Sequence, residues 1–167
     1  MATGYIRWYR DPMLEYDFAN QLQRLRELGC TFAEADEKPE QPPLVERIAT
    51  ADDLTLHLRP PSGPIVPVRF SRLRPDLLLQ VYLLTGSLAE TDVVEAVLWD
   101  AYRRNLASTR ALVIDRVGHA RTVPWDEVVL QGGGAVEPLP DVVLLREESD
   151  PPTPFTRFTL IEHRPGG

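Results

Sequence analysis

The sequence holds a single cysteine, Cys30, and no long apolar run. One cysteine cannot form an intrachain disulfide, a CxxC redox motif or a thiolate metal site, so these three classes are excluded. No stretch reaches the length of a membrane span, and the first residues lack the basic start and apolar core of a secretion signal. We therefore expect a cytoplasmic protein with no membrane partner.

Lysine is nearly absent: Lys38 is the only lysine among the 18 basic residues. The chain also has 25 acidic residues. The formal net charge of −7 gives no overall attraction for phosphate backbones. The charge balance thus disfavours a nucleic acid as partner, with a local arginine patch as the alternative. Internal repeats of about 20 to 50 residues are also missing, which argues against solenoids and propellers.

The remaining composition is that of an ordinary globular protein, with 43% hydrophobic and 26% charged residues. A chain of 167 residues fits one domain, residues 1–167, and can bury about 70% of its unfolded surface. Its 16 prolines predict many short elements joined by turns, rather than a few long helices.

The N-terminal part predicts a strand followed by an amphipathic helix. Residues 4–10, GYIRWYR, alternate and are rich in aromatic side chains, as in a strand. Asp11 suits a helix cap and Pro12 the first helical position, and apolar residues then recur at helical spacing until Gly29 ends the pattern. Residues 33–43 are acidic and proline-rich, which predicts a solvated loop.

A hairpin is predicted next. Residues 54–58 and 66–70 each place apolar side chains on one face, on either side of a Pro-Ser-Gly turn. Pro67 cannot donate a ladder hydrogen bond, so the second strand is expected to lie at an edge or to be interrupted there.

The middle of the chain contains one ambiguous segment and one clear helix. The apolar run at 76–85 fits both a buried helix and a buried strand, and the proline before it and glycine after it favour the helix. Ser87 and Glu90 form an S-x-x-E capping box, which predicts a helix over 88–106.

Four strands are predicted in the C-terminal third, at residues 111–115, 119–123, 141–147 and 155–163. Helices at the front and middle with strands behind them indicate the α+β class. We expect an antiparallel or mixed sheet with two main helices packed on one face.

Residues 114–127, IDRVGHARTVPWDE, hold the densest group of candidate catalytic side chains. A three-residue loop that ends at Gly118 predicts a hairpin in which Asp115 lies opposite His119 and shares a face with Arg121. A two-residue loop would shift the register and separate them. We prefer the first register, in which Asp115 and His119 form either half of a catalytic triad or an exposed cross-strand pair. The exposed pair is favoured because no G-x-S-x-G motif is present.

The end of this segment predicts the start of another helix. Asp126 and Glu127 are neighbours and so do not share a face, which makes them a poor acid/base couple. Pro124 suits the first helical position, and the helix dipole favours acidic residues in the first turn.

No cofactor and no metal are expected. The three histidines, His57, His119 and His163, lack the spacing of a zinc site. The only glycine run, GGGAV at 132–136, lacks the Lys-Ser/Thr pair of a phosphate loop. Cys30 directly follows the glycine that ends the first helix, and we expect a buried, inert thiol.

Two segments are candidates for binding. In the first strand we expect Trp8 to be buried and the arginines to lie over tyrosines; the alternative is an edge at which Arg7, Trp8 and Arg10 contact nucleic acid or a peptide. The acidic segment could present a negative surface to a basic partner. Its residues are Glu34, Asp36, Glu37 and Glu40, with Glu147, Glu148 and Asp150 later in the chain.

Known catalytic constellations are missing or badly spaced, so the sequence favours a non-catalytic protein that binds another macromolecule, with a protein as the expected partner. An inhibitor, an immunity-type protein or an assembly subunit would fit. The alternative is a small hydrolase or ligand-binding enzyme that uses Asp115, His119 and Arg121. A third interpretation is a nucleic-acid-binding accessory protein. The identity of the partner and the oligomeric state are left open.

Overall fold

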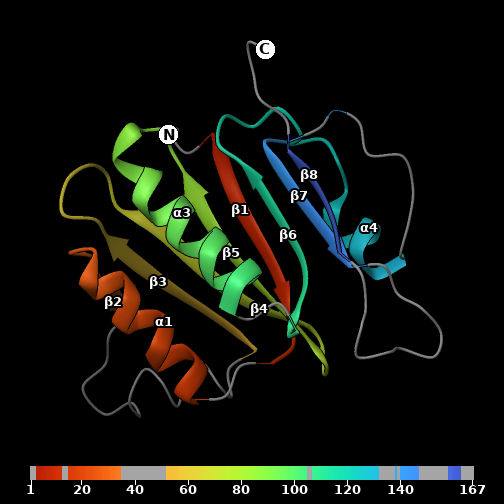
Figure 1. Cartoon of the computed structure of the whole chain (residues 1–167), viewed down its shortest axis with the longest axis horizontal. Helices are drawn as coiled ribbons and strands as arrows, with labels where there is room; N and C mark the ends of the chain where they lie inside the picture. Colours follow the sequence, from red (N-terminus) through yellow and green to blue (C-terminus); the bar gives the residue numbers. More distant parts are fainter. Residues whose placement is uncertain are drawn as a thin grey trace.

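Alternating apolar residues build strands that join into one antiparallel sheet (Figure 1). The computed structural model describes residues 3–12, 15–34, 52–104, 107–131, 138, 140–146 and 158–162. Among these residues the sheet has eight strands in the order β2-β3-β4-β5-β1-β6-β7-β8, and each neighbouring pair is antiparallel. The α+β class and the antiparallel sheet are therefore confirmed.

The strands are β1 (Gly4–Arg10), β2 (Thr31–Glu34), β3 (Asp53–Arg59), β4 (Val66–Arg74), β5 (Leu77–Leu84), β6 (Thr109–Asp115), β7 (Val142–Arg146) and β8 (Phe158–Glu162). The helices are α1 (Glu15–Glu27), α3 (Thr91–Trp99) and α4 (Trp125–Gln131). A 3-10 turn (Leu88–Glu90) precedes α3, and a π-helical segment (Asp100–Arg104) follows it. Among the described residues no helix has the length and apolar character needed to cross a bilayer.

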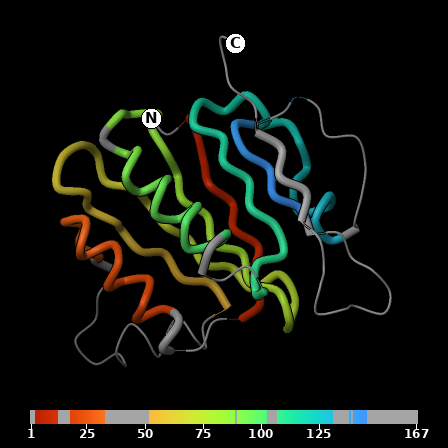
Figure 2. Tube along the Cα trace, viewed as in Figure 1, coloured from red at the N-terminus to blue at the C-terminus, as the bar shows by residue number. Residues whose placement is uncertain are grey.

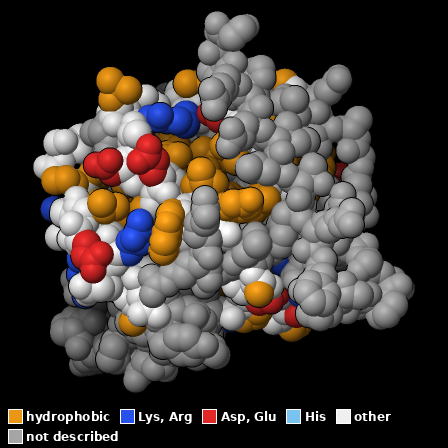
Figure 3. Space-filling model, in the orientation of Figure 1, with side chains coloured by type: hydrophobic (Ala, Val, Ile, Leu, Met, Phe, Trp, Pro, Cys, Tyr) orange, Lys and Arg blue, Asp and Glu red, His pale blue; other side chains and the backbone are white. Residues whose placement is uncertain are grey.

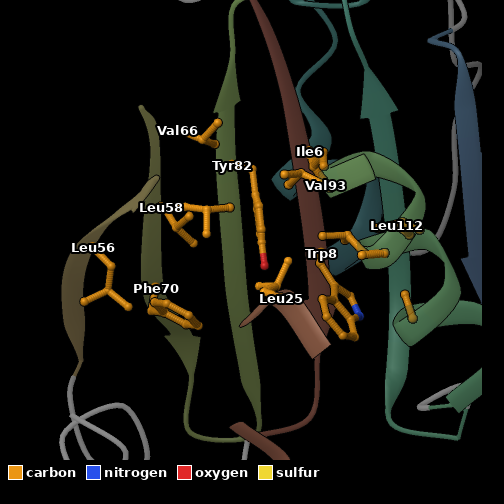
Figure 4. Close-up of a cluster of buried hydrophobic side chains, with 14 of the residues drawn as sticks. Ile6, Trp8, Leu25, Leu56, Leu58, Val66, Phe70, Tyr82, Val93 and Leu112 are labelled. Carbon is orange, nitrogen blue, oxygen red and sulfur yellow. The ribbon is translucent and has the colours of Figure 1, made fainter. Parts of the chain in front are cut away.

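The side chains of β1 point alternately to the two faces of the sheet. Ile6 and Trp8 point to the front face, where they join a core cluster with residues of α1 and α3 (Figures 1 and 4). Tyr5 and Tyr9 point to the back face and join a second cluster with Trp125 of α4. The sequence predicted two main helices on one face, and α4 is a further helix that packs on the back face.

The strand β1 and the end of the first predicted helix are confirmed, whereas the predicted helix start at Asp11 and Pro12 is not tested. The helix α1 ends in a Schellman motif, in which Gly29 has a φ of +86° and the N–H of Cys30 donates to the carbonyl of Leu25 at 3.0 Å. Residues 13 and 14 lie outside the described part. Two residues of the predicted solvated loop, Ala33 and Glu34, belong instead to β2, which pairs with β3; residues 35–51 are outside the described part.

The hairpin of β3 and β4 is confirmed, but β4 is not an edge strand. It lies between β3 and β5. Pro67 pairs with His57 of β3 and precedes Val68, the first residue of β4 that pairs with β5. Pro67, which has no N–H to donate, therefore lies outside the β4–β5 ladder, and this is why an interior strand tolerates it.

Residues 77–84 form a strand, so the preference for a helix there was wrong. The strand β5 lies between β4 and β1, and both of its faces are covered: Leu78 and Tyr82 are buried at the front, Leu77 and Leu79 at the back. A strand buried on both faces gives a continuous apolar run, which has no period that separates it from a buried helix.

The predicted helix at 88–106 is present as three consecutive segments, through residue 104. Glu90 closes the capping box, since its carboxylate accepts the N–H of Ser87 at 2.9 Å. In Figure 2 this segment crosses the front of the sheet between the path of α1 and that of β6. The strands β6, β7 and β8 agree with the prediction, whereas residues 119–123 are not a strand.

Candidate functional site

The loop between β6 and α4 is closed by a carboxylate rather than by strand pairing. The Oδ1 atom of Asp115 accepts the N–H groups of Gly118 and His119, both at 2.9 Å, and its Oδ2 atom accepts the N–H of Ala120 at 2.7 Å. Residues 119–122 form turns. The hairpin prediction was therefore wrong, because the Asp115 side chain supplies the acceptors that a second strand would have supplied.

The expected catalytic residues of this loop have separate roles. Asp115 is 0% exposed and contacts the main chain of His119, while the side chain of His119 is exposed. The guanidinium of Arg121 donates to the carbonyl of Thr3. In the described part of the chain no hydrogen bond joins the three side chains, so they do not form a triad.

The loop lies directly against the beginning of β1. Gly118 has a φ of +81°, and a Cβ atom there would lie 2.4 Å from the carbonyl oxygen of Thr3. A Cβ atom on Gly4 would lie 2.1 Å from the carbonyl oxygen of Arg116. Only glycine permits these two approaches, which fix the loop to the strand.

Behind the loop, two aromatic side chains share one acceptor. The hydroxyl of Tyr5 donates to the carbonyl of Ala120 at 2.9 Å. Nε1 of Trp125 donates to the same carbonyl at 3.3 Å and to the Tyr5 hydroxyl at 2.9 Å. Burial raises the pKa of Tyr5, and the charge of Asp115 adds to this, although the bond from Trp125 opposes it. The polar atoms of both rings are thus satisfied inside the protein.

A second network joins β1 to the first turn of α4. Oδ1 of Asp126 accepts hydrogen bonds from Nη2 of Arg7 and from the hydroxyl of Tyr9, and Nε of Arg7 donates to the Tyr9 hydroxyl at 2.9 Å. Burial raises the pKa of Tyr9, and the bond to Asp126 adds to this while Arg7 opposes it. Burial alone would lower the pKa of Arg7, but Tyr9 and Asp126 raise it, so this guanidinium stays charged.

These contacts agree with two of the sequence predictions. The guanidinium of Arg7 lies 5.7 Å from the centre of the Tyr9 ring, as expected for an arginine over a tyrosine. Asp126 and Glu127 lie in the first turn of α4, which begins directly after Pro124, as predicted for a helix start.

An open groove of about 420 Å³ lies on the back face, beside the beginning of α4. We call it the back-face groove. Its apolar wall comes from β1, β5 and the start of α4, and its charged groups include two arginines and two carboxylates. The lining residues are Tyr5, Arg7, Val81, Leu83, Arg121, Val123, Pro124, Trp125, Asp126 and Glu127. It therefore gathers candidates that the sequence placed apart, Arg7 with Arg121 and Asp126, and leaves out His119.

The residues proposed as a nucleic-acid edge do not share one surface. The strand β1 is an interior strand between β5 and β6. Trp8 and Arg10 are buried, with the Arg10 guanidinium 3.9 Å from the centre of the Trp8 ring, and Arg7 points to the opposite face. Burial of Trp8 agrees with the structural interpretation made from the sequence, but Arg10 lies over the Trp8 ring and not over a tyrosine.

The acidic binding candidates are only partly described. Glu34 is the last residue of β2, and Asp36 and Glu37 lie outside the described residues, as do Glu40, Glu147, Glu148 and Asp150. The acidic surface therefore stays a prediction.

Cys30 is a free, buried thiol whose pKa is raised by burial and by the charge of Asp92, in agreement with an inert cysteine. His57 lies in β3, while His163 and the glycine run at 132–136 lie outside the described residues. Within the described ranges no group of three His, Cys, Asp or Glu side chains could hold a metal ion.

Sequence reasoning missed the pairing of β1 with α4. Tyr9 and Asp126 are 117 positions apart, and Tyr5 and Trp125 are 120 apart. The only signal was that Tyr5, Arg7 and Tyr9 share a strand face, since nothing local says what covers that face.

Comparisons of this chain with protein-family models, with curated proteins and with solved structures each found no match.

Proposed function

We propose that this chain is a non-catalytic protein that binds another protein through the back-face groove. The observation that supports this is the groove lining, in which the exposed Leu83 and the edges of the largely buried Tyr5 and Trp125 lie beside two arginines. Aromatic residues and arginine are the residue types enriched where proteins bind one another. An inhibitor, an immunity-type protein or an assembly subunit would each use such a surface.

The carboxylates of Asp115 and Asp126 are engaged in structural contacts, whereas that of Glu127, which also lines the groove, is exposed. Asp115 accepts three main-chain N–H groups, and Asp126 accepts hydrogen bonds from Arg7 and Tyr9. A general base needs a carboxylate or imidazole aimed at a substrate proton. The remaining imidazole of this loop, on His119, is exposed and does not line the groove.

The groove is held in shape before any partner arrives. Asp115 fixes the loop, the loop places the carbonyl of Ala120, and that carbonyl orients Tyr5 and Trp125. Ordering side chains on binding costs about 0.5 to 1.5 kcal/mol for each flexible side chain. Preordered rings avoid much of this cost, which favours a binding role.

Two further properties belong to this proposal. A cytoplasmic location is supported by the single cysteine, which is buried as a free thiol. One domain with α1 and α3 as its main helices on the same face is supported by the front cluster, which contains Phe18 of α1 and Val93 of α3 together with strand residues.

The test is a charge placed in the groove. Leu83 is 41% exposed and lines the groove, whereas Ile65 is 45% exposed and does not. Tagged wild-type chain, Leu83→Asp and Ile65→Asp are purified from the native cell, and the amount of each co-purifying protein is measured per tagged chain. We expect one protein that is recovered with the wild type and with Ile65→Asp, and at least about tenfold less with Leu83→Asp, because burying a carboxylate under the partner carries a large desolvation cost.

The proposal fails if all three chains recover the same proteins in the same amounts. Thermal unfolding of the three purified chains is the control for folding. Both substitutions are at exposed positions, so their effect on the free energy of unfolding should stay within about 0.5 kcal/mol.

A further inference from the structure

A second exposed surface runs along the outward side of α3 and the segments that flank it. Within α3, Asp92, Glu95 and Trp99 follow one another at spacings of three and four positions, which is the spacing of one α-helix face. Leu88 lies in the 3-10 turn before α3, and Tyr102 lies in the π-helical segment after it. All five are exposed: Leu88, Asp92, Glu95, Trp99 and Tyr102. We call this surface the α3 stripe.

The apolar members of the α3 stripe are not required by the core. The inner side of α3 already buries Val93, Ala96 and Val97 against the sheet. Leu88 is nevertheless 86% exposed and Trp99 42% exposed, on the outer side. The guanidinium of Arg24 lies 4.1 Å from the centre of the Trp99 ring and supports it from α1. Exposed large apolar side chains at both ends of one helical segment are candidates for a contact surface.

The middle of the stripe is acidic. In the part of the chain that the structure describes, neither Asp92 nor Glu95 forms a hydrogen bond or ion pair. The helix dipole favours Asp92 in the first turn of α3, but its effect has faded at Glu95. Figure 3 shows acidic and apolar side chains side by side on the face that carries α3. The stripe thus offers two carboxylates between apolar ends.

We infer that the α3 stripe docks an amphipathic helix of a partner protein whose middle carries lysine or arginine between apolar residues. Charge complementarity selects basic groups opposite Asp92 and Glu95. The alternation of three and four positions is the spacing at which two helices interdigitate their side chains. The stripe lies on the front of the sheet, so this inference goes beyond the back-face groove and does not depend on it.

The same charges disfavour other occupants. A second copy of the chain, packed stripe to stripe about a twofold axis, would bring Glu95 against Glu95, and like charges in contact repel. Nucleic acids and anionic lipid surfaces would also meet the two carboxylates. A basic protein segment avoids this repulsion.

The experiment uses the purified full chain and a fluorescent peptide of about three heptads, with leucine at two positions of each heptad and lysine or alanine elsewhere. Binding is followed by fluorescence anisotropy. The double variant Asp92→Lys, Glu95→Lys is compared with Glu27→Lys, Asp52→Lys, which makes the same change in net charge at exposed positions off the stripe and off the back-face groove. Leu88→Gln tests the apolar end without altering charge or a packed side chain.

We expect the stripe double variant to weaken peptide binding at least about tenfold and Leu88→Gln to weaken it clearly, while the control double variant changes it less than about threefold. Leu83→Asp should bind the peptide like the wild type, which separates this inference from the proposed function. If the two double variants lost peptide binding equally, net charge alone would explain the effect, and the inference would be overturned. So would a wild-type chain that does not bind the peptide, or one that sedimentation shows to be a dimer dissociated by the stripe variant.

Discussion

At the scale of single residues, Asp115 organises the loop that borders the groove. Its two carboxylate oxygens accept three consecutive main-chain N–H groups, and the side chain is wholly buried. A buried donor that loses its acceptor costs about 1 to 3 kcal/mol. The stability of this loop therefore depends on one side chain, although the neighbouring His119 is the more obvious candidate for chemistry.

Asp115→Ala should lower the free energy of unfolding by about 3 kcal/mol or more, because three N–H groups lose their acceptor. His119→Ala should change it by less than about 0.5 kcal/mol, since its side chain is exposed. Urea denaturation of both variants beside the wild type measures the difference. Similar effects of the two substitutions would contradict this view of the loop.

At the scale of elements, the beginning of the α3 region is held by one buried carboxylate. Glu90 accepts the N–H of Thr85 at 3.0 Å, the hydroxyl of Thr85 at 3.1 Å and the N–H of Ser87 at 2.9 Å. Arg116 of the loop donates to the carbonyl of Ser87 at 3.1 Å. The exit of β5, the 3-10 turn and the loop after β6 are thus connected at one end of the sheet.

Glu90→Ala should destabilise the protein by about 2 to 4 kcal/mol, because the main-chain donors of Thr85 and Ser87 are left without their carboxylate. Hydrogen exchange of these two amides should accelerate as well. Glu95→Ala is the matched control, as it removes an exposed glutamate from the same helical region. An unchanged exchange rate at Thr85 and Ser87 in Glu90→Ala would show that the capping bonds contribute little.

At the scale of the whole molecule, buried tyrosines link the sheet to the elements on both faces. Tyr5 and Tyr9 hold α4 and its loop at the back, and Tyr82 accepts a hydrogen bond from Gln21 of α1 at 2.9 Å at the front. Burial is the main cause that raises the pKa of each of these three tyrosines. Their neutral forms are therefore favoured in the folded state.

Stability should consequently fall as the pH rises above about 10, where tyrosines of the unfolded chain lose their protons and these three keep theirs. The folded state then binds more protons than the unfolded state, so the slope is negative, up to about 1.4 kcal/mol per pH unit for each tyrosine. Urea denaturation at a series of alkaline pH values, with tyrosinate absorbance to follow ionisation, measures it. Tyr5→Phe should give a shallower slope, and a flat profile above pH 10 would contradict the prediction.

Several elements could be predicted because their signals are local. Gly29 ends α1 in a left-handed conformation, Glu90 closes its capping box, and the alternation of β1 separates Trp8 from Tyr9. The segment at 77–84 could not be predicted, since burial on both faces removes the period on which a choice depends. The hairpin after β6 failed because the side chain of Asp115 competed with strand pairing for the same N–H groups.

The sequence by itself determined the α+β class, most strands, the two longer helical regions and the two faces of β1, since periodicity and caps act over a few residues. Only the tertiary structure decided that β1 and β5 are interior strands, that α4 covers the back face, and that Arg7 meets Asp126 from 119 positions away. These outcomes depend on which apolar faces bury one another. The order of strands in a sheet cannot be predicted from the hydrophobic pattern of any single strand.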